Sequence, residues 1–194
     1  MSVLVLALVL AADPTGSGLV DVHDAVPRAV LEMHYATPDN FLHKAVYAHA
    51  RCLLRADAAA ALNRVEARLE KDGLRLKLWD CYRPLSVQRA MWALVPVKGL
   101  VADPNHGGSH HNRGTAVDAS LVDLAGKDIP MPTKHDDFTK AGRRDAPCAD
   151  AKACENKSKL RAAMEAEGFT TIRTEWWHFD GPGADHAPLL DEPL

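Results

Sequence analysis

The chain has 194 residues, a length that favours one compact domain over two. Hydrophobic residues make up 47% and charged residues 25%, which is the composition of a folded globular protein and argues against extensive disorder. A formal net charge of −3 supplies no basic field for a phosphate backbone, so we expect no nucleic-acid partner.

An apolar segment opens the chain and runs without interruption from Val3 to Ala12. Its length suits the hydrophobic region of a secretory signal peptide and is too short to span a bilayer, so we expect no transmembrane segment. It lacks a basic residue before it and a small-x-small cleavage site after it, and a buried first strand is the alternative. We predict a signal peptide and linker over residues 1–24, a domain over residues 25–194, and a periplasmic or secreted location. A retained leader would indicate the cytoplasm instead.

Four cysteines, an even number, fit an oxidising compartment in which two disulfides persist. None belongs to a C-x-x-C pair, which argues against a zinc ion bound by four cysteines. We predict a short bridge between Cys148 and Cys154 and a second bridge between Cys52 and Cys81.

The first regular element that the sequence predicts in the domain is a helix. Between Asp57 and Lys71, apolar residues recur at spacings of four, three and four, as one helical face requires, and Gly73 provides a left-handed stop. From Leu74 to Leu78, leucines alternate with basic residues, which is typical of a strand with one buried face. A helix that leads directly into a strand indicates a mixed fold.

A second helix is predicted at Leu85 to Leu94, because Pro84 can occupy a first helical turn. This assignment places Arg83 where a strand meets a helix. Residues 102–114 contain two consecutive glycines and three histidines, a composition that predicts a loop close to the site.

Thr115 to Leu121 alternates with period two, which predicts a strand that carries Asp118 on the same face as Ala116 and Ser120. The polar stretch 123–150 is longer than ordinary connections, and such loops are usually functional, for instance as a substrate lid.

The last predicted elements are a helix capped by Asn156 that continues to Glu167, and a strand from Phe169 to Ile172. The whole pattern predicts an α+β fold. We expect a central, largely antiparallel sheet flanked by helices, in a single compact domain with a metal site in a cleft.

Two imidazoles and a carboxylate from separate segments suit a catalytic zinc site, which takes three nitrogen or oxygen ligands and leaves a fourth position for water. His111, Asp118 and His178 supply this set. Glu175, close to His178, is the candidate for the carboxylate that moves the proton of the attacking water. His110 is the adjacent alternative ligand, but an extended chain would turn it away from the side that His111 faces.

Residues three apart on an ideal strand point to opposite faces, so Glu175 and His178 could not both reach one metal ion from a regular strand. We therefore predict a bulge or bend at Trp176 and Trp177.

Two motifs carry a resemblance to a known family. Ser109 to Asp118 matches S-x-H-x-x-G-x-A-x-D, and Glu175 to His178 matches E-x-W-H. These are the patterns of the zinc D,D-peptidases, and the sequence resembles in particular the zinc D-Ala-D-Ala dipeptidases associated with vancomycin resistance. The segments YATPDNF, which begins at Tyr35, and WDCYRP, which ends at Pro84, add to this resemblance, so that it extends from about residue 28 to residue 180.

The resemblance implies one zinc ion per chain, held by His111, Asp118 and His178. It also implies that Glu175 acts as general base and acid, and that Arg83 stabilises the developing oxyanion. Without the resemblance, Arg83 would more simply be an ion-pair partner, for example of Asp80.

The resemblance further implies contacts with a small dipeptide substrate. Tyr35 and Asp136 would bind its amino end, and Ser109 its carboxylate. The sequence KHDDF around Asp136 differs from the aromatic-Asp pattern of the family, so Asp137 is an alternative in a shifted register.

Two other functions remain open from the sequence. A zinc D,D-carboxypeptidase that trims D-alanine from cell-wall pentapeptide stems would use the same zinc and the same glutamate. A non-catalytic zinc-binding domain is an alternative of a different class, against which the intact Glu175 and Arg83 argue. No feature of the sequence predicts an oligomeric state.

Overall fold

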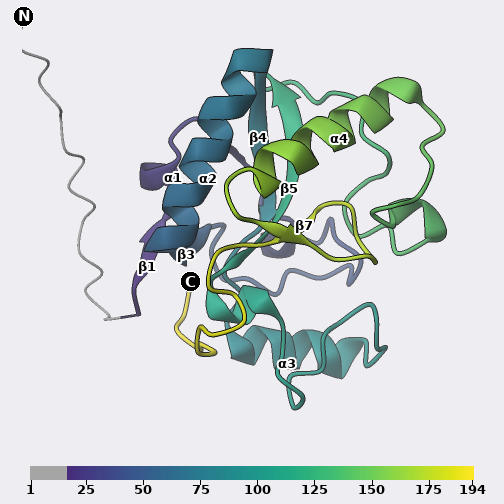
Figure 1. Ribbon diagram of the computed structural model, residues 1–194. Coiled ribbons are helices and arrows are strands. Elements are labelled where there is room, and N and C mark those ends of the chain that lie inside the picture. Colours follow the sequence, from purple (N-terminus) through teal and green to yellow (C-terminus); the bar gives the residue numbers. More distant parts are fainter. Residues whose placement is uncertain (1–16) are drawn as a thin grey trace, which may run out of the picture.

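The computed structural model describes residues 17–194, which form a sheet with helices on one face (Figure 1). The predicted signal peptide falls on residues that lie outside this described range. The helices and strands, in chain order, are β1 (Leu19–Asp21), α1 (Val22–Ala25), β2 (Val30–Leu31), β3 (Leu53–Arg55), α2 (Ala56–Leu69), β4 (Leu74–Asp80), α3 (Leu85–Leu94), β5 (Ala116–Asp123), α4 (Ala151–Glu165), β6 (Thr170–Thr171) and β7 (His178–Asp180). Short 3-10 helices add η1 (His34–Ala36), η2 (Glu70–Asp72), η3 (His110–Arg113) and η4 (Lys140–Gly142).

The main sheet has five strands in the order β2-β4-β5-β7-β6. Only the pair β2 and β4 is parallel among the described strands, and the other neighbours are antiparallel. Strands β1 and β3 form a separate antiparallel pair. The predicted α+β class with a largely antiparallel sheet is therefore confirmed.

Helices α2 and α4 lie against the same face of the sheet, and α3 lies apart from them, at the bottom of Figure 1. The covered face carries alternate residues of β4 and β5, among them Leu76, Val117 and Leu121, which are completely buried. The apolar stripe of α2 that the sequence predicts packs into this core. The helix α2 ends at Leu69 and leads into η2, which stops at Gly73, whose φ of +73° is the left-handed conformation that glycine favours.

The opposite face of the sheet carries Asp118, Ser120 and Lys77, which the β4–β5 register and the strand alternation place together. The alternation of leucines and basic residues predicts that Lys77 points to solvent, but only 7% of its surface is exposed. Its ammonium group lies 2.5 Å from carboxylate oxygens of Glu32 and Asp128, because the loops around these residues cover this face. The site is thus built between the sheet and a layer of loops.

The prediction for α4 is wrong at its beginning. The helix starts at Ala151, and the Asp150 side chain accepts a hydrogen bond of 2.9 Å from the backbone N–H of Lys152. Asn156 lies inside the helix, buried, and donates to the Pro130 carbonyl at 2.9 Å. The first two turns of α4, AKACENKS, contain no large aliphatic or aromatic residue, so no apolar stripe marks them in the sequence.

The fold also begins earlier than predicted. Residues 19–25, assigned to a linker and the start of the domain, form β1 and α1, with Leu19 and Val22 buried. A three-residue strand is too short to show a period in the sequence.

Both predicted disulfides are confirmed: Cys52 pairs with Cys81, and Cys148 pairs with Cys154. No helix formed by residues 17–194 combines the length and the apolarity that crossing a membrane requires.

Candidate active site

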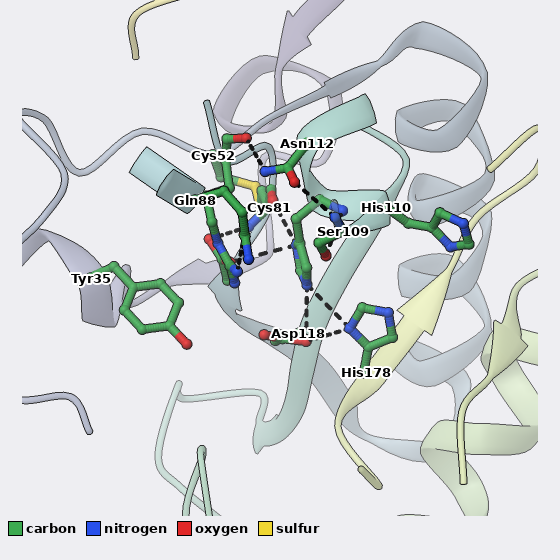
Figure 2. Close-up of polar contacts among 12 residues, drawn as sticks. Tyr35, Cys52, Cys81, Gln88, Ser109, His110, Asn112, Asp118 and His178 are labelled. Atoms are coloured by element: carbon green, nitrogen blue, oxygen red, sulfur yellow. Dashed lines mark hydrogen bonds and ion pairs between the residues drawn. A yellow bond between two sulfur atoms is a disulfide. The ribbon is translucent and has the colours of Figure 1, made fainter. Parts of the chain in front are cut away.

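The pairing of β5 with β7 brings the first two candidate ligands together. Asp118 lies directly opposite His178 in this antiparallel ladder, and its Oδ1 is 3.0 Å from His178 Nδ1. Figure 2 shows the two side chains pointing toward each other. Directly opposed residues of antiparallel strands share a face, so the register itself fixes this contact.

The chain bends at Trp176 and Trp177, immediately before β7, as predicted. The backbone N–H of Trp176 donates to Gly142 at 3.0 Å, while the Trp177 carbonyl accepts from Ala119 at 2.9 Å. The bend turns the preceding Glu175 back to the side of His178, and its Oε2 lies 3.9 Å from His178 Nδ1.

The third candidate ligand, His111, lies on η3 and is buried. Ser109 caps this short helix, because its hydroxyl accepts from the His111 backbone N–H at 3.2 Å. The Asn112 side chain accepts from the Ser109 N–H and donates to the Arg83 carbonyl, each at 2.8 Å. These bonds fix the loop that precedes β5 against the segment that precedes α3.

Three hydrogen-bond acceptors converge at the centre of the site. His111 Nδ1 lies 2.7 Å from the carbonyl oxygen of Cys81, which can only accept, so this nitrogen carries the proton and Nε2 carries a lone pair. His178 Nε2 lies 2.9 Å from a carboxylate oxygen of Asp180, so in the neutral ring Nε2 carries the proton and Nδ1 carries the lone pair. Both lone pairs face Asp118 Oδ1.

These atoms are spaced as a metal ion requires. His111 Nε2 is 3.1 Å from His178 Nδ1 and 3.3 Å from Asp118 Oδ1. Tetrahedral zinc with bonds of about 2.0–2.1 Å sets its ligand atoms roughly 3.3 Å apart. The three ligand atoms lie within 4.8 Å of one another on buried residues, and with both imidazoles neutral they form three converging acceptors, which fit a cation.

The pKa values of the two nearby carboxyl groups, Asp118 and Glu175, are shifted in opposite directions. Burial by itself raises the pKa of Asp118. When the rings are protonated, the positive charge of His111 and hydrogen bonds from His111, His135 and His178 outweigh burial and hold that pKa well below its ordinary value. Burial raises the pKa of Glu175 above its ordinary value, against the opposing effect of His178. Asp118 thus suits a permanent anionic ligand, and Glu175 suits a group that gains and loses a proton.

Arg83 lies between β4 and α3, as predicted, with its side chain buried. Its Nη2 and Nε lie 2.5 and 3.1 Å from Asp80 Oδ2, and its Nη1 donates to the Gln88 side chain at 2.8 Å. Burial works against the charged form, yet Asp80 raises the pKa of Arg83 well above its ordinary value. The guanidinium lies 5.1 Å from the centre of the Tyr35 ring, so Arg83 both forms the ion pair with Asp80 and lies beside a residue of the candidate site.

Tyr35 and Asp136 meet at the other end of the site. The Tyr35 hydroxyl donates to Asp136 Oδ2 at 3.0 Å, and burial raises the pKa of Asp136. Asp136 has a φ of +58°, in the left-handed region that aspartate tolerates better than most residues. Asp137 instead caps the following turn by accepting from the Thr139 N–H at 3.0 Å, so the structure places Asp136 in the site and not Asp137.

All the side chains that the sequence singles out line one cavity of about 140 Å³: Tyr35, Arg83, Ser109, His111, Asp118, Asp136, Glu175 and His178. A larger hollow of about 670 Å³ lies beside it, and Asp136 lines both. Residues of the long 123–150 segment therefore form part of the wall between the two spaces.

Sequence reasoning missed Asp180 and His135. Asp180 accepts from His178 Nε2, and its same oxygen lies 2.8 Å from His110 Nδ1. His110 accordingly points away from the converging acceptors (Figure 2). A strand alternates its side chains, so the position two residues after His178 was a signal for Asp180. His135 lies 3.1 Å from Asp118 Oδ2, and no spacing in the sequence signals that contact.

Comparisons with known proteins place the chain among the peptidases. A family described as D-ala-D-ala dipeptidase matches residues 15–193. The D-alanyl-D-alanine dipeptidase of Escherichia coli (strain K12) is 38% identical over 172 residues, which cover 89% of this chain and 89% of that protein. Proteins of the same name from Streptomyces coelicolor and Enterococcus faecium are 35% and 30% identical, over 75% and 82% of this chain and 82% and 85% of their own lengths. The chain belongs to the D-Ala-D-Ala dipeptidase family.

Proposed function

We propose that this protein is a zinc-dependent dipeptidase that hydrolyses D-Ala-D-Ala to two molecules of D-alanine. The family match and the names of the relatives support the dipeptidase activity. One observation carries the zinc-dependent mechanism: three acceptor atoms converge inside a small buried cavity that also holds Glu175 and Arg83. A cavity of about 140 Å³ suits a small substrate, because sites for drug-sized ligands are typically about 300–1,000 Å³.

One zinc ion would be held by His111 Nε2, Asp118 Oδ1 and His178 Nδ1. Bound zinc polarises a peptide carbonyl and lowers the pKa of water, which is the chemistry that amide hydrolysis needs at neutral pH. The donor set fits this ion, since two imidazoles and one carboxylate leave a position open for water.

Glu175 takes the proton of the attacking water and passes it to the leaving amine as the peptide C–N bond breaks. Its raised pKa suits both halves of this transfer, because the group must first accept and then donate the same proton. Arg83 meets the negative charge that develops on the carbonyl oxygen. Its bonds to Asp80 and Gln88 hold the guanidinium in place before the substrate arrives.

The two charged ends of the dipeptide are bound at opposite ends of the cavity. Asp136, oriented by the Tyr35 hydroxyl, binds the ammonium group. Ser109 binds the carboxylate, because its hydroxyl accepts from the His111 N–H and keeps its own proton to donate. A buried charge without a partner is severely penalised, so these contacts favour a free zwitterionic dipeptide.

We also propose that the protein is exported. The apolar leader from Val3 to Ala12 supports this location, and so do two disulfides, which persist in oxidising compartments. Mass spectrometry of the protein recovered from the periplasm or the medium should give a polypeptide that lacks the leader. Recovery of the unprocessed chain in the cytoplasm alone would contradict export.

A second candidate function is a zinc D,D-carboxypeptidase that acts on pentapeptide stems. The hollow of about 670 Å³ favours it, because this space adjoins the site at Asp136, where the rest of a longer peptide would have to lie. The third candidate, a non-catalytic zinc-binding domain, leaves the partly buried Glu175 and the buried Arg83 without a role.

A two-substrate assay separates these functions. The full chain is freed of metal with a chelator, reloaded with zinc, and offered D-Ala-D-Ala or an acylated tripeptide that ends in D-Ala-D-Ala. We expect D-alanine only from the free dipeptide and only after zinc is restored. Release from the acylated tripeptide alone would identify the carboxypeptidase. Zinc binding without hydrolysis of either substrate would support the non-catalytic domain.

A further inference from the structure

The two carboxylate oxygens of Asp118 have different surroundings. Oδ1 lies 3.0 Å from His178 Nδ1 and 3.3 Å from His111 Nε2, so it faces the converging acceptors. Oδ2 lies 3.1 Å from Nε2 of His135. Within the described part of the chain this is the one hydrogen bond that Oδ2 makes, and it comes from a residue outside the set of candidate ligands.

The His135 ring is fixed by its neighbours. It stacks on Trp79 with ring centres 4.9 Å apart and an angle of 24° between the planes, and it meets the edge of Trp177 at 5.8 Å. Its Nδ1 lies 2.9 Å from His34 Nδ1. The His135 side chain is 1% exposed, so bulk water cannot replace its contact with Asp118.

The direction of the hydrogen bond follows from the partners. A carboxylate only accepts, so His135 Nε2 must carry a proton to bond Asp118 Oδ2. The Nδ1 of neutral His135 can then accept from the Nδ1–H of His34. A charged His135 would have protons on both nitrogens and would still donate from Nε2. The donor to Asp118 is therefore present in either protonation state.

We propose that His135 is a positioning residue for Asp118, an inference that rests on the proposed zinc-dependent function. By holding Oδ2, His135 leaves Oδ1 as the single oxygen that Asp118 presents to the cation, and it stops the carboxylate from rotating. Groups that orient a metal ligand from outside the site commonly change metal affinity about 10- to 100-fold when they are removed.

A purely structural role for His135 makes a different prediction. As an aromatic filler between Trp79 and Trp177, the ring would be replaceable by phenylalanine, and its N–H would have no effect on the metal. Three variants separate these roles. His135→Phe keeps the ring and removes the donor, His135→Gln keeps an N–H near the position of Nε2, and His135→Asn has the same amide but is too short to reach Asp118.

The experiment measures the zinc dissociation constant of the full chain by competition with a chromophoric chelator, together with kcat and KM for D-Ala-D-Ala. The unfolding midpoint of each metal-free variant is recorded, so that a loss of fold is recognised. The exposed His106, changed to phenylalanine, is the matched control for a histidine replaced elsewhere, and we expect it to bind zinc as the wild type does.

We expect the dissociation constant to rise about 10- to 100-fold in His135→Phe and His135→Asn, and to change less than about threefold in His135→Gln. Rescue by glutamine but not by asparagine supports the positioning role even where phenylalanine destabilises the fold. Zinc binding by His135→Phe at wild-type strength would overturn the inference, as would equal losses in glutamine and asparagine variants of unchanged unfolding midpoint. If the wild type itself binds no zinc, the proposed function fails; if it binds zinc and only the expected loss is missing, this inference alone fails.

Discussion

The two ends of the cavity are built in different ways. At the metal end, Asp118 and His178 are opposed on neighbouring strands, and the backbone ladder between β5 and β7 sets their distance. At the opposite end, here called the amino end because the ammonium group of the substrate is proposed to bind there, Tyr35 lies on a 3-10 helix. Asp136 lies on a long loop, in a left-handed conformation. The sheet thus positions two of the three proposed metal ligands, whereas a 3-10 helix and a loop position the groups proposed to recognise the substrate.

This difference predicts which kinetic or binding constant a substitution at each end should change. Side chains on paired strands have few alternative positions, which suits bonds that must form at fixed lengths around an ion. Loops vary more readily than the elements they connect and so carry recognition. Changes at the metal end should lower kcat or metal affinity, and changes at the amino end should raise KM.

The largest effect is expected at the metal end, from Glu175→Gln. The amide keeps the size of the side chain but cannot take a proton from water, so kcat should fall about 10²- to 10⁴-fold. Zinc content, measured by atomic absorption, should stay at one ion per chain because Glu175 is not among the three converging groups. The exposed Glu165→Gln is the matched control. A variant that retains wild-type kcat would remove Glu175 from the mechanism.

Arg83→Lys is expected to follow. Lysine keeps the charge but loses the planar fork that bonds Asp80 and Gln88, so it cannot hold the same position. Steady-state kinetics should show kcat lowered about 10²- to 10³-fold. The same change at the exposed Arg89 should leave kcat unaltered. Wild-type kcat in Arg83→Lys would show that the oxyanion needs only a nearby charge.

At the amino end, Asp136→Asn should raise KM for D-Ala-D-Ala about 10- to 100-fold, since a hydrogen bond to a charged group contributes about 1.5–3 kcal/mol. The value of kcat should change much less, because Asp136 is proposed to touch the ammonium group and not the reacting carbonyl. Asp137→Asn tests the alternative register and should leave both constants near those of the wild type. If Asp137→Asn raises KM and Asp136→Asn does not, Asp137 and not Asp136 binds the ammonium group.

The smallest effect on catalysis is expected from the disulfide that lies outside the site. Replacing Cys148 and Cys154 by alanine opens a loop with a sequence separation of 6, and chain entropy predicts a loss of about 2 kcal/mol in the free energy of unfolding. We expect kcat to change less than about twofold. Urea unfolding and steady-state kinetics on the same preparation check both values, and a large fall in kcat would show that this loop reaches the site.

The other disulfide is linked to the metal end of the cavity through Cys81. The bridge between Cys52 and Cys81 closes a sequence separation of 29, for which the same relation predicts about 3 to 4 kcal/mol. The Cys81 carbonyl also accepts the His111 Nδ1–H. Replacing both cysteines of this bridge by alanine should therefore weaken zinc binding as well as lower the free energy of unfolding. A loss of stability with unchanged zinc affinity would separate the bridge from the metal end.

Local patterns predict the elements that have a clear period. The helix at residues 85–94 and the strand that carries Asp118 were predictable because their residues repeat at the spacing of one face or follow a proline. The start of α4 was not, because its first two turns contain no large apolar residue and Asn156 resembles a cap, although it is a buried donor to Pro130.

The site could be predicted only as a set of residues, and not as an arrangement. The register that opposes Asp118 to His178 depends on long-range pairing, which no local spacing encodes. The same limit explains His135, which reaches Asp118 only because loop 123–150 folds over the open face of the sheet. The bend at Trp176 and Trp177 was predictable because the chemistry required Glu175 and His178 on one side.

Anomalous diffraction from crystals of the zinc-loaded protein, recorded on both sides of the zinc absorption edge, tests whether His111, Asp118 and His178 bind one zinc ion. We predict a single strong peak at bonding distance, about 2.0–2.2 Å, from His111 Nε2, Asp118 Oδ1 and His178 Nδ1. A peak at another place, such as beside His110 and Asp180, or no peak in protein that cleaves the dipeptide, would contradict it.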